Sequence, residues 1–531
     1  MDVFAKINLR ATRQTDRADA RQVRNSAGGF TFEVTPETRL RRFLTLGTEG
    51  GTYYTNARDL TEENAAVVMD FARNRTADLV AEIVAVSTAG RAPKQNPALF
   101  ALAAAASLGD DDGRRTALDA LPLVARTGTH LFLFARYIEQ FRGWGRGLRR
   151  GVANWYLDKS VEDLAFQSVK YRQREGWTHR DLLRLSHPQT DQDARRRLFD
   201  WICGRETALD GLRLVEGFTR AQTAPVAQLP ELVREYRLSW EMLPDEGIND
   251  PLVWEALLDN GMPQTALMRQ LPRLTRLGLL SPLGARTKVV AAQLADRDRL
   301  CKARVHPMNV LVAQRTYAAG RSARGESTWE PSRPIVDALD AAFYAAFEAV
   351  EPTGKRYLLA LDVSGSMTAA ISGLPLSARE ASAALALVTA STESACDIVG
   401  FTSAGDGWRD AALTPLSISP RQRLDDAIRA VSRLPFGGTD CALPMLYALE
   451  RELQVDVFVV LTDNDTWAGR IHPHQALAEY RRKVNPAAKL VVIGMTATNF
   501  TIADPDDSGS LDIAGFDSAV PTLLADFARG L

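Results

Sequence analysis

The 531-residue sequence has few cysteines, few histidines and no long apolar run. Its four cysteines are widely spaced and form no CxxC pair, which argues against a zinc ribbon or a disulfide framework and fits a reducing compartment. Uncharged stretches such as Pro97–Gly109 are shorter than the roughly 18 residues that a membrane span needs. The first residues also lack the apolar segment of a signal peptide. We therefore expect a cytoplasmic protein that does not contact a membrane.

The chain also lacks an excess of either positive or negative charge. The chain has 64 Lys and Arg against 65 Asp and Glu, a balance that by itself argues against a nucleic-acid binder. Residues 1–350, however, carry 49 basic and 43 acidic side chains, whereas residues 351–531 carry 15 and 22. This asymmetry suggests that a polyanion-binding part is joined to an acidic part. A helical surface rich in ion pairs gives the same count, so the charge alone leaves both interpretations open.

The apolar pattern from about residue 62 to about residue 347 is helical. Stretches rich in Leu, Ala and Arg, among them residues 115–140, alternate with short breakers such as GDDDG (109–113) and DNGMPQ (259–264). Many short helices joined by brief turns are typical of paired helices stacked as an α-solenoid of the HEAT type. No repeat of fixed period is visible, so an irregular helical bundle is the alternative.

The pattern changes at about residue 353. Short, continuous apolar runs there predict strands buried on both faces: YLLAL (357–361), CDIVGF (396–401), VDVFVVL (455–461) and LVVIGM (490–495). Helical stretches alternate with them, at 377–393, 421–432, 441–453 and 474–483. This βαβ pattern predicts an α/β domain with a doubly wound parallel sheet at 351–531, after a helical domain at 1–350.

Oxygen-bearing side chains follow the predicted strands at three places, DVSGS (362–366), GGTD (437–440) and TDND (462–465). Because ligands in parallel sheets bind at the carboxyl ends of strands, we expect these segments to meet. Carboxylate and hydroxyl oxygens suit a hard divalent cation such as Mg²⁺. Few direct negative charges would leave the ion electrophilic, so that an acidic side chain of a partner protein could complete its shell. A strand-end cap formed by Asp362 and Ser364 without an ion is the alternative.

The arrangement resembles the metal-ion-dependent adhesion site of von Willebrand factor A domains, whose DxSxS motif, loop Thr and loop Asp have matching positions here. The resemblance implies that Ser364, Ser366 and Thr439 contact the ion directly, and that Asp362 and Asp463 act directly or through water.

These loops contain two further acids, and two classes of metal-dependent enzyme are alternatives to a binding site. We interpret Asp440 and Asp465 as solvated loop acids. A phosphatase of the haloacid dehalogenase type would need a second acid where this chain has Ser364. A two-metal nuclease would need several carboxylates to bridge its ions. We therefore expect no catalysis at this site.

Residues 142–187 combine basic and aromatic side chains. Arginine presents forked donors to phosphates, and aromatic rings offer platforms for bases. The basic side chains form two groups, Arg142, Arg146, Arg149 and Arg150, and then Lys170, Arg172, Arg174, Arg180 and Arg184. The aromatic residues interleaved with them are Trp144, Trp155, Tyr156, Tyr171 and Trp177, each of which taken singly is more often a core residue. His179 and His187 suit capping or packing better than metal binding.

Blocks along nearly the whole chain resemble the Ro (TROVE) family: NSAGGFTFEVT, GTEGGTYY, GWGRGLRRGVANWY, VKYRQREGWTHRDLLRLSH, INDPLVWEALLDNGMP, VHPMNVLVAQRTYAAGRSARG and ALDAAFYAAFEAVEPTGKRYLLALDVSGSM. The resemblance implies a ring of HEAT-like repeats closed by a von Willebrand factor A domain. It further implies binding of small noncoding Y RNAs on an outer basic surface, and of single-stranded 3′ ends of misfolded or immature RNAs in a central hole. A link to 3′ exoribonucleases and to RNA turnover under stress would follow.

The resemblance also points to particular residues. The block that carries RNA contacts in the family contains Lys170, Arg172, Arg174, His179, Arg180 and His187 of this chain. Arg142, Arg146, Arg149 and Arg150 are carried over as a second group. The main hypothesis is thus a non-catalytic RNA-binding protein. A protein-interaction module that captures an acidic partner through Mg²⁺ is the competing one, and both can hold.

Overall fold

The computed structural model describes residues 11–46, 57–89, 95–322, 326–371, 374–403, 413–434, 437–495, 498–516 and 520–530. The chain forms two compact units. Unit 1 comprises Met1–Arg42, Thr48–Glu63 and Ala291–Leu531, and unit 2 comprises Phe43–Gly47 and Asn64–Val290. The GTEGGTYY block (47–54) lies outside the described residues. Within those residues, no helix is both long enough and apolar enough to cross a membrane.

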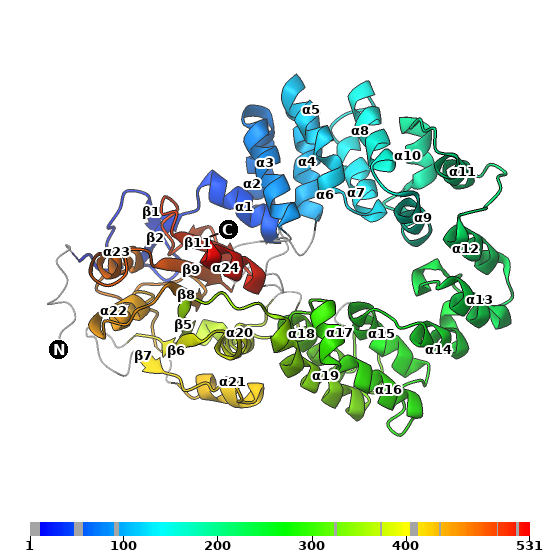
Figure 1. The fold of residues 1–531 in the computed structure, drawn as a ribbon. Coiled ribbons are helices and arrows are strands. Elements are labelled where there is room, and N and C mark those ends of the chain that lie inside the picture. Colours follow the sequence, from blue (N-terminus) through cyan, green and yellow to red (C-terminus); the bar gives the residue numbers. More distant parts are fainter. Residues whose placement is uncertain are drawn as a thin grey trace. The chain divides into compact units, whose positions relative to one another are not determined.

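Unit 2 is helical, as the sequence predicts, and helices that are close in the sequence pack against one another, for example α3 with α4 and α13 with α14 (Figure 1). Polar caps start several of them; Ser160, for instance, accepts a hydrogen bond from the amide of Asp163. The helices, of which α2 begins in unit 1 and α16 ends in unit 1, are α2 (Ala57–Asn74), α3 (Thr76–Thr88), α4 (Asn96–Leu108), α5 (Asp111–Asp119), α6 (Leu121–Val124), α7 (Gly128–Glu139), α8 (Arg146–Leu157), α9 (Val161–Lys170), α10 (His179–Ser186), α11 (Asp193–Ile202), α12 (Arg213–Thr223), α13 (Leu229–Tyr236), α14 (Pro251–Asp259), α15 (Gln264–Arg276) and α16 (Ala285–Leu294).

The segment between α9 and α10 differs from a simple helix break. It forms a hairpin of β3 (Gln173–Arg174) and β4 (Trp177–Thr178), in which Arg174 pairs with Trp177. Glu175 and Gly176 connect the strands with φ angles of 53° and 84°. A two-residue turn with both φ angles positive matches the right-handed twist of a hairpin and favours glycine. The hairpin therefore fixes the direction in which Arg174 leaves the backbone.

Unit 1 contains the predicted doubly wound sheet, with strand order β11-β9-β8-β5-β6-β7. All neighbours are parallel except β7, which is an antiparallel edge strand. The strands are β5 (Arg356–Asp362), β6 (Ala395–Phe401), β7 (Leu413–Pro415), β8 (Val457–Thr462), β9 (Lys489–Gly494) and β11 (Ser510–Ala514). The helices that alternate with them are α20 (Ala378–Thr392), α21 (Leu424–Ser432), α22 (Leu443–Glu450), α23 (Pro473–Lys483) and α24 (Val520–Arg529).

The strand order places a crevice at the end of β5. From β5 the chain first builds β6 and β7 on one side and then β8, β9 and β11 on the other, so the order reverses at this strand. Ligands of doubly wound sheets bind where the order reverses, outside the carboxyl ends of the strands. Asp362 ends β5 and Thr462 ends β8, and both are buried.

Further segments belong to unit 1. Near the start of the chain β1 (Gln22–Arg24) and β2 (Phe30–Glu33) form a small antiparallel sheet with β10 (Phe500–Thr501), and α1 (Pro36–Leu46), which begins in unit 1 and ends in unit 2, follows. The helices α17 (Arg297–Lys302), α18 (Pro307–Ala318) and α19 (Arg333–Ala345) are also part of it. Tyr344, on α19, accepts a 2.9 Å hydrogen bond from the amide of Leu424. The predicted domain boundary at residues 350 and 351 thus lies inside unit 1 and stays a prediction.

Candidate metal site and nucleic-acid interface

Asp362 is held at the end of β5 by two hydrogen bonds. Its side chain is 1% exposed. One carboxylate oxygen accepts from the amide of Ser364 at 2.8 Å, and the other accepts from the hydroxyl of Thr462 at 2.8 Å. The hydroxyls of Ser364 and Ser366 lie 3.0 Å apart. The hydrogen bond expected of a strand-end cap between Asp362 and Ser364 is therefore present. The hydroxyl of Ser366 lies beside that of Ser364 in the same loop.

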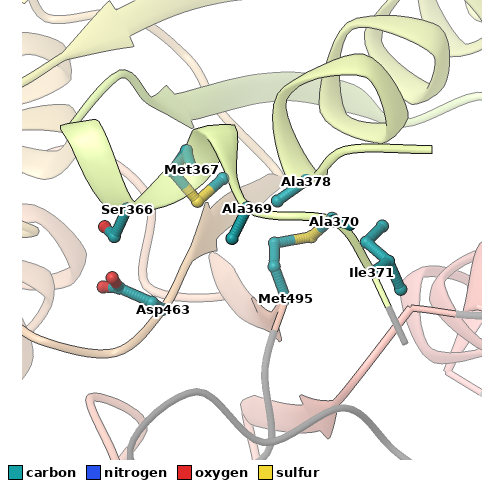
Figure 2. A pocket seen from close by; sticks show the side chains of 8 residues that line it. All are labelled: Ser366, Met367, Ala369, Ala370, Ile371, Ala378, Asp463 and Met495. Carbon is teal, nitrogen blue, oxygen red and sulfur yellow. The ribbon is translucent and has the colours of Figure 1, made fainter.

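Asp463 follows β8 and brings a second carboxylate to this crevice. Figure 2 shows the side chains of Ser366 and Asp463 pointing toward one another on the wall of a pocket that Met367 and Met495 also line. Burial and, after it, the negative charge of Asp463 raise the pKa of Asp362 to about 7, although hydrogen bonds from Ser364 and Thr462 oppose the rise. Two buried carboxylates thus repel one another across a site lined with hydroxyls.

The third predicted segment is bound to the loop that follows β8. The carbonyl of Thr439 accepts hydrogen bonds from the amides of Trp467 and Ala468, both at 3.1 Å. The hydroxyl of Thr466 accepts from the amide of Cys441 at 3.0 Å. The structure therefore brings the loops of Asp362, Thr439 and Asp463 to the same end of the sheet, in the order that the sequence predicts.

The interpretation of Asp440 and Asp465 as solvated acids is wrong. Their side chains are 7% and 4% exposed. Asp440 accepts hydrogen bonds from the side chain of Gln14 at 2.7 Å and from the amide of Ala442 at 3.0 Å. Burial raises the pKa of Asp440 to about 6. Residues from the start of the chain cover these acids, and nothing in the loop sequences themselves indicates that cover.

The donor set fits a hard divalent cation. In the part of the chain that the structure describes, no three His, Cys, Asp or Glu side chains are grouped as metal ligands, so an ion here would need the serine and threonine hydroxyls in its shell. A cation would relieve the repulsion between Asp362 and Asp463. Arg379 adds a buried positive charge that acts on Asp362 and donates to the carbonyls of Val363 and Ser364.

Most of the predicted RNA-contacting side chains lie on the surface of unit 2. Arg146, Arg149 and Arg150 are exposed on α8, and Arg172, Arg174, Arg180 and His187 are exposed between the end of α9 and the residue after α10. Arg184, which is basic but not among the predicted RNA contacts, is exposed on α10 as well. Arg142 is half-buried and donates to the carbonyl of Ala106 at 3.0 Å. Lys170 is 23% exposed and lies 3.5 Å from Glu241, so its charge is paired within the protein.

An aromatic contact joins the two basic groups. Trp144, which precedes α8, packs against Trp177 of β4 with ring centroids 5.4 Å apart. Because Trp177 pairs with Arg174, this contact connects the α8 arginines to the hairpin. Trp155 and Tyr156, in contrast, are fully buried core residues, as expected for aromatic residues taken singly. We call the exposed arginines of α8, of the hairpin and of α10 the basic surface; they are Arg146, Arg149, Arg150, Arg174, Arg180 and Arg184.

His179 does not belong to the basic surface. Its ring is 3% exposed, forms a 2.8 Å hydrogen bond with the hydroxyl of Tyr156 and packs against Phe132. Burial lowers its pKa to about 4, so the ring is neutral at pH 7. Sequence position suggests an RNA contact, but this burial argues against one. His187 caps α10 with a φ angle of 47° and is exposed, so it remains available.

The start of α8 has an unfavourable charge pattern. Arg146 is its first residue, Arg149 and Arg150 follow within the next turn, and the helix has no acid in its first turn. The N-terminus of a helix carries a partial positive charge, which is stabilised by anions and destabilised by cations. Within the described residues, none of these three arginines pairs with an acid. This end of the helix is therefore electrostatically suited to phosphate.

Comparisons with known proteins agree with one another. A model of the TROVE domain matches residues 23–209 and 235–316, and a model of the Ro60 vWA domain matches residues 356–528. The "RNA-binding protein RO60" of Deinococcus radiodurans is 42% identical over 525 residues, which are 97% of each chain. The protein of that name from Caenorhabditis elegans is 36% identical over 98% of this chain and 92% of its own length. The crystal structure of the D. radiodurans RO (RSR) protein superposes with a TM-score of 0.77 at 41% identity, covering 93% of this chain and all of that one.

Proposed function

Because this chain belongs to the Ro (TROVE) family, we propose that it is a non-catalytic RNA-binding protein. The observation that carries the proposal is the basic surface, with exposed arginines on α8, in the hairpin and on α10, and with Trp144 beside α8 packed on Trp177 of the hairpin. Two relatives that match over almost the whole chain bear the name RNA-binding protein. The proposed ligands are small noncoding Y RNAs on the basic surface and single-stranded 3′ ends of misfolded or immature RNAs.

The chemistry of the basic surface suits a structured RNA. Guanidinium groups donate to phosphate oxygens in pairs, and the α8 arginines lie where the helix end itself attracts an anion. Exposed arginines can also stack on unpaired bases. Binding at such a surface is mostly electrostatic, so it selects RNA by shape and by the spacing of phosphates more than by base sequence.

A charge-reversal experiment tests the basic surface. The triple variant R146E/R149E/R150E should weaken binding of a small structured RNA at least 100-fold in a gel-shift assay at 100 mM salt, because three phosphate contacts become repulsive. The control variant R196E/R205E/R234E changes the net charge of unit 2 equally, at exposed arginines outside the basic surface. Equal losses in both variants would show that only net charge matters and would overturn the assignment of the surface.

The proposal includes a place in RNA quality control. The protein would present bound RNAs to a 3′ exoribonuclease for maturation or decay under stress, and would not cleave them itself. Purified protein incubated with labelled RNA and Mg²⁺ should leave the RNA intact. Cleavage that disappears in the variant S366A would instead assign a nuclease to the metal site.

A second function is favoured by the metal site. We propose that Ser364, Ser366 and Thr439 hold a divalent cation, Mg²⁺ in the cell, with Asp362 and Asp463 acting directly or through water. The bound ion would supply a positive centre to which an acidic side chain of a partner protein adds the last ligand. The buried, mutually repelling carboxylates of Asp362 and Asp463 support this function.

Binding of Mn²⁺ as a probe tests the metal site. Calorimetry should detect one site in the wild-type protein, and the variant S366A should bind the ion at least tenfold more weakly, since it loses a ligand but no buried charge. The RNA affinity of S366A should remain as in the wild type, because the basic surface lies in the other unit. Equal Mn²⁺ affinity in both proteins would contradict the ligand assignment.

A further inference from the structure

The segment at the start of the chain packs on the loops of the candidate metal site. The side chain of Gln14 is fully buried there. Its amide nitrogen donates to the carboxylate of Asp440 at 2.7 Å and to the carbonyl of Ile471 at 2.9 Å. Its amide oxygen accepts from the hydroxyl of Thr466 at 2.6 Å and from the amide of Gly469 at 3.1 Å. Gln14 thus uses its two donors and both lone pairs of its acceptor.

These four bonds connect the two loops that carry the later metal-binding residues. Asp440 directly follows Thr439, and Thr466 and Gly469 belong to the loop that begins with Asp463. The backbone reinforces the contact, because the amide of Gln14 donates to the carbonyl of Gly469 at 3.0 Å. A side chain more than 420 positions away in the sequence therefore adds four bonds to the direct contacts of Thr439 and Cys441 with the second loop.

Other residues of the same segment hold the loop after β8. The side-chain amide of Asn25 donates to the carbonyl of Thr466 at 2.7 Å, and the amide of Ala27 donates to Asp465 at 3.3 Å. Gly29 lies so close to the carbonyl of Thr466 that a β-carbon would come within 2.0 Å of the oxygen. Residues 14–29, which we call the N-terminal strap, thus pack on this loop without room for a side chain at Gly29.

We propose that Gln14 is a positioning residue of the metal site and that the N-terminal strap is part of that site. The inference rests on the proposed function of the site as a cation site. Gln14 does not touch the ion; it acts through Asp440 and Thr466, which set the backbone positions of Thr439 and Asp463. In other proteins, residues that hydrogen-bond to the metal ligands orient those ligands in this way, and substitution of such a residue weakens metal binding about 10- to 100-fold. The α/β domain at 351–531 is incomplete without the strap.

The coupling must act in both directions. If the docked strap strengthens cation binding, then the bound cation strengthens docking of the strap by the same factor, because linkage between two sites is reciprocal. Addition of Mn²⁺ to the wild-type protein should therefore slow hydrogen exchange of the strap amides.

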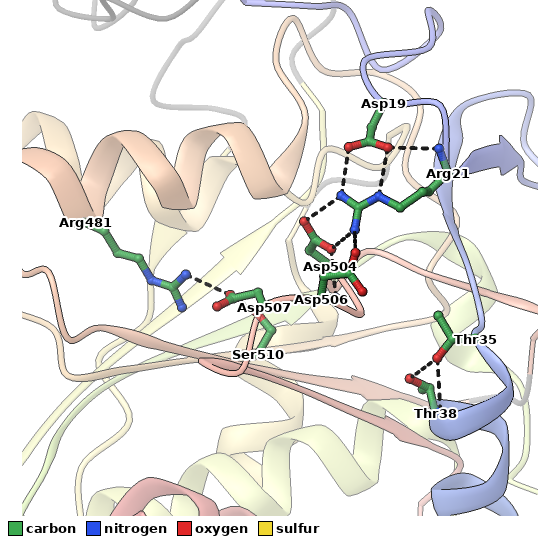
Figure 3. A network of polar contacts seen from close by, with 9 residues as sticks. All are labelled: Asp19, Arg21, Thr35, Thr38, Arg481, Asp504, Asp506, Asp507 and Ser510. Carbon is green, nitrogen blue, oxygen red and sulfur yellow. Dashed lines mark hydrogen bonds and ion pairs between the residues drawn. The ribbon is translucent and has the colours of Figure 1, made fainter.

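The experiment compares full-length variants by their affinity for Mn²⁺, measured by calorimetry. Q14A should bind Mn²⁺ about tenfold more weakly than the wild type. The matched control is R481A, since Arg481 lies on α23, outside the N-terminal strap, and pairs with Asp507 at 2.7 Å (Figure 3). This ion pair is partly exposed, and R481A should bind Mn²⁺ within twofold of the wild type. Thermal unfolding of each variant without Mn²⁺ distinguishes a destabilised fold from a folded protein whose metal ligands are misplaced.

The outcomes are distinguishable. Absence of Mn²⁺ binding to the wild-type protein would overturn both the cation site and the role of Gln14. Wild-type binding with an unchanged affinity in Q14A would overturn the role of Gln14 alone. If Q14A fails to fold, hydrogen exchange of the wild-type strap decides: about tenfold slower exchange with saturating Mn²⁺ supports the coupling, and unchanged exchange overturns it.

Discussion

At the scale of single residues, burial rather than residue type decides which polar side chains are accessible to a ligand. His179 and His187 stand eight positions apart in one predicted RNA-contacting block, yet one ring is enclosed by Phe132 and Tyr156 and the other faces solvent. Asp440 and Asp465 look like ordinary loop acids in the sequence, yet the N-terminal strap covers them. Such differences depend on contacts between distant segments, which no local pattern records.

The burial of His179 makes the stability of unit 2 depend on pH. The pKa of the ring is lowered from 6.5 to about 4 in the folded state, so the unfolded chain takes up the proton first as the pH falls. The contribution is constant above about pH 6.5 and is lost progressively between pH 6.5 and 4. By pH 5 the folded state should have lost about 2 kcal/mol from this group.

Urea denaturation followed by circular dichroism at pH 7.5, 6 and 5 checks this. H179F should lose less stability than the wild type over that range, although it lacks the hydrogen bond to Tyr156 and is less stable at pH 7.5. H187F, at an exposed ring beside the end of the same helix, controls for the exchange of a histidine for a phenylalanine. If H179F and the wild type lost equal stability on acidification, His179 would not be the titrating group.

At the scale of secondary-structure elements, α8 carries a conflict between stability and binding. An arginine at the first position of a helix opposes the macrodipole, whereas an acid there stabilises the helix. R146E should therefore raise the free energy of unfolding by about 0.5–1 kcal/mol while it weakens RNA binding several-fold. Chemical denaturation and gel shift on the same preparation test both signs. A variant that loses stability would show that Arg146 has a structural role.

The β3–β4 hairpin makes a second prediction at this scale. Gly176 has a φ angle of 84°, and nothing lies within 4 Å of the position that a β-carbon would take, so a methyl group there adds backbone strain and no clash. G176A should cost about 1–2 kcal/mol in the hairpin and lower RNA affinity without altering any charge. G204A, at a glycine with a φ angle of 74° and similarly open surroundings after α11, introduces the same strain away from the basic surface. Equal RNA affinity in G176A and the wild type would show that the conformation of the hairpin does not contribute to RNA binding.

The secondary-structure elements also show how much of the fold the sequence predicts. The four central strands are continuous apolar runs, and the structure confirms them within two residues at each end. The apolar pattern does not predict β11, because its sequence, SLDIA, contains Asp512, which pairs with Arg42 of α1. The pattern favours one helical stretch at 115–140, but Pro122 and the cap at Thr127 divide it into α5, α6 and α7. For the metal site, the sequence predicts the loops and their order, whereas it does not indicate the contribution of Gln14.

At the scale of the whole molecule, the near-neutral net charge conceals a local concentration of basic side chains on unit 2, the surface that we propose binds RNA. The chain carries 64 basic and 65 acidic residues, so long-range attraction to RNA is nearly absent and affinity must come from local phosphate contacts. Each contact releases counterions, and the logarithm of the affinity falls with the logarithm of the salt concentration by about 0.7 per phosphate for single strands. A protein with this net charge should therefore show a steep salt dependence, which only a concentrated basic surface can produce.

Filter binding between 50 and 300 mM salt measures that slope. The wild type should give a slope steeper than about −3, the value that corresponds to about five phosphates contacted by the proposed basic surface. R146E/R149E/R150E should lower the magnitude of the slope by about 2, since three phosphate contacts are lost. R196E/R205E/R234E should leave the slope nearly unchanged even though the net charge falls by the same amount. The slope, unlike the affinity, counts contacts, so it separates local binding on the basic surface from a general effect of charge on the whole protein.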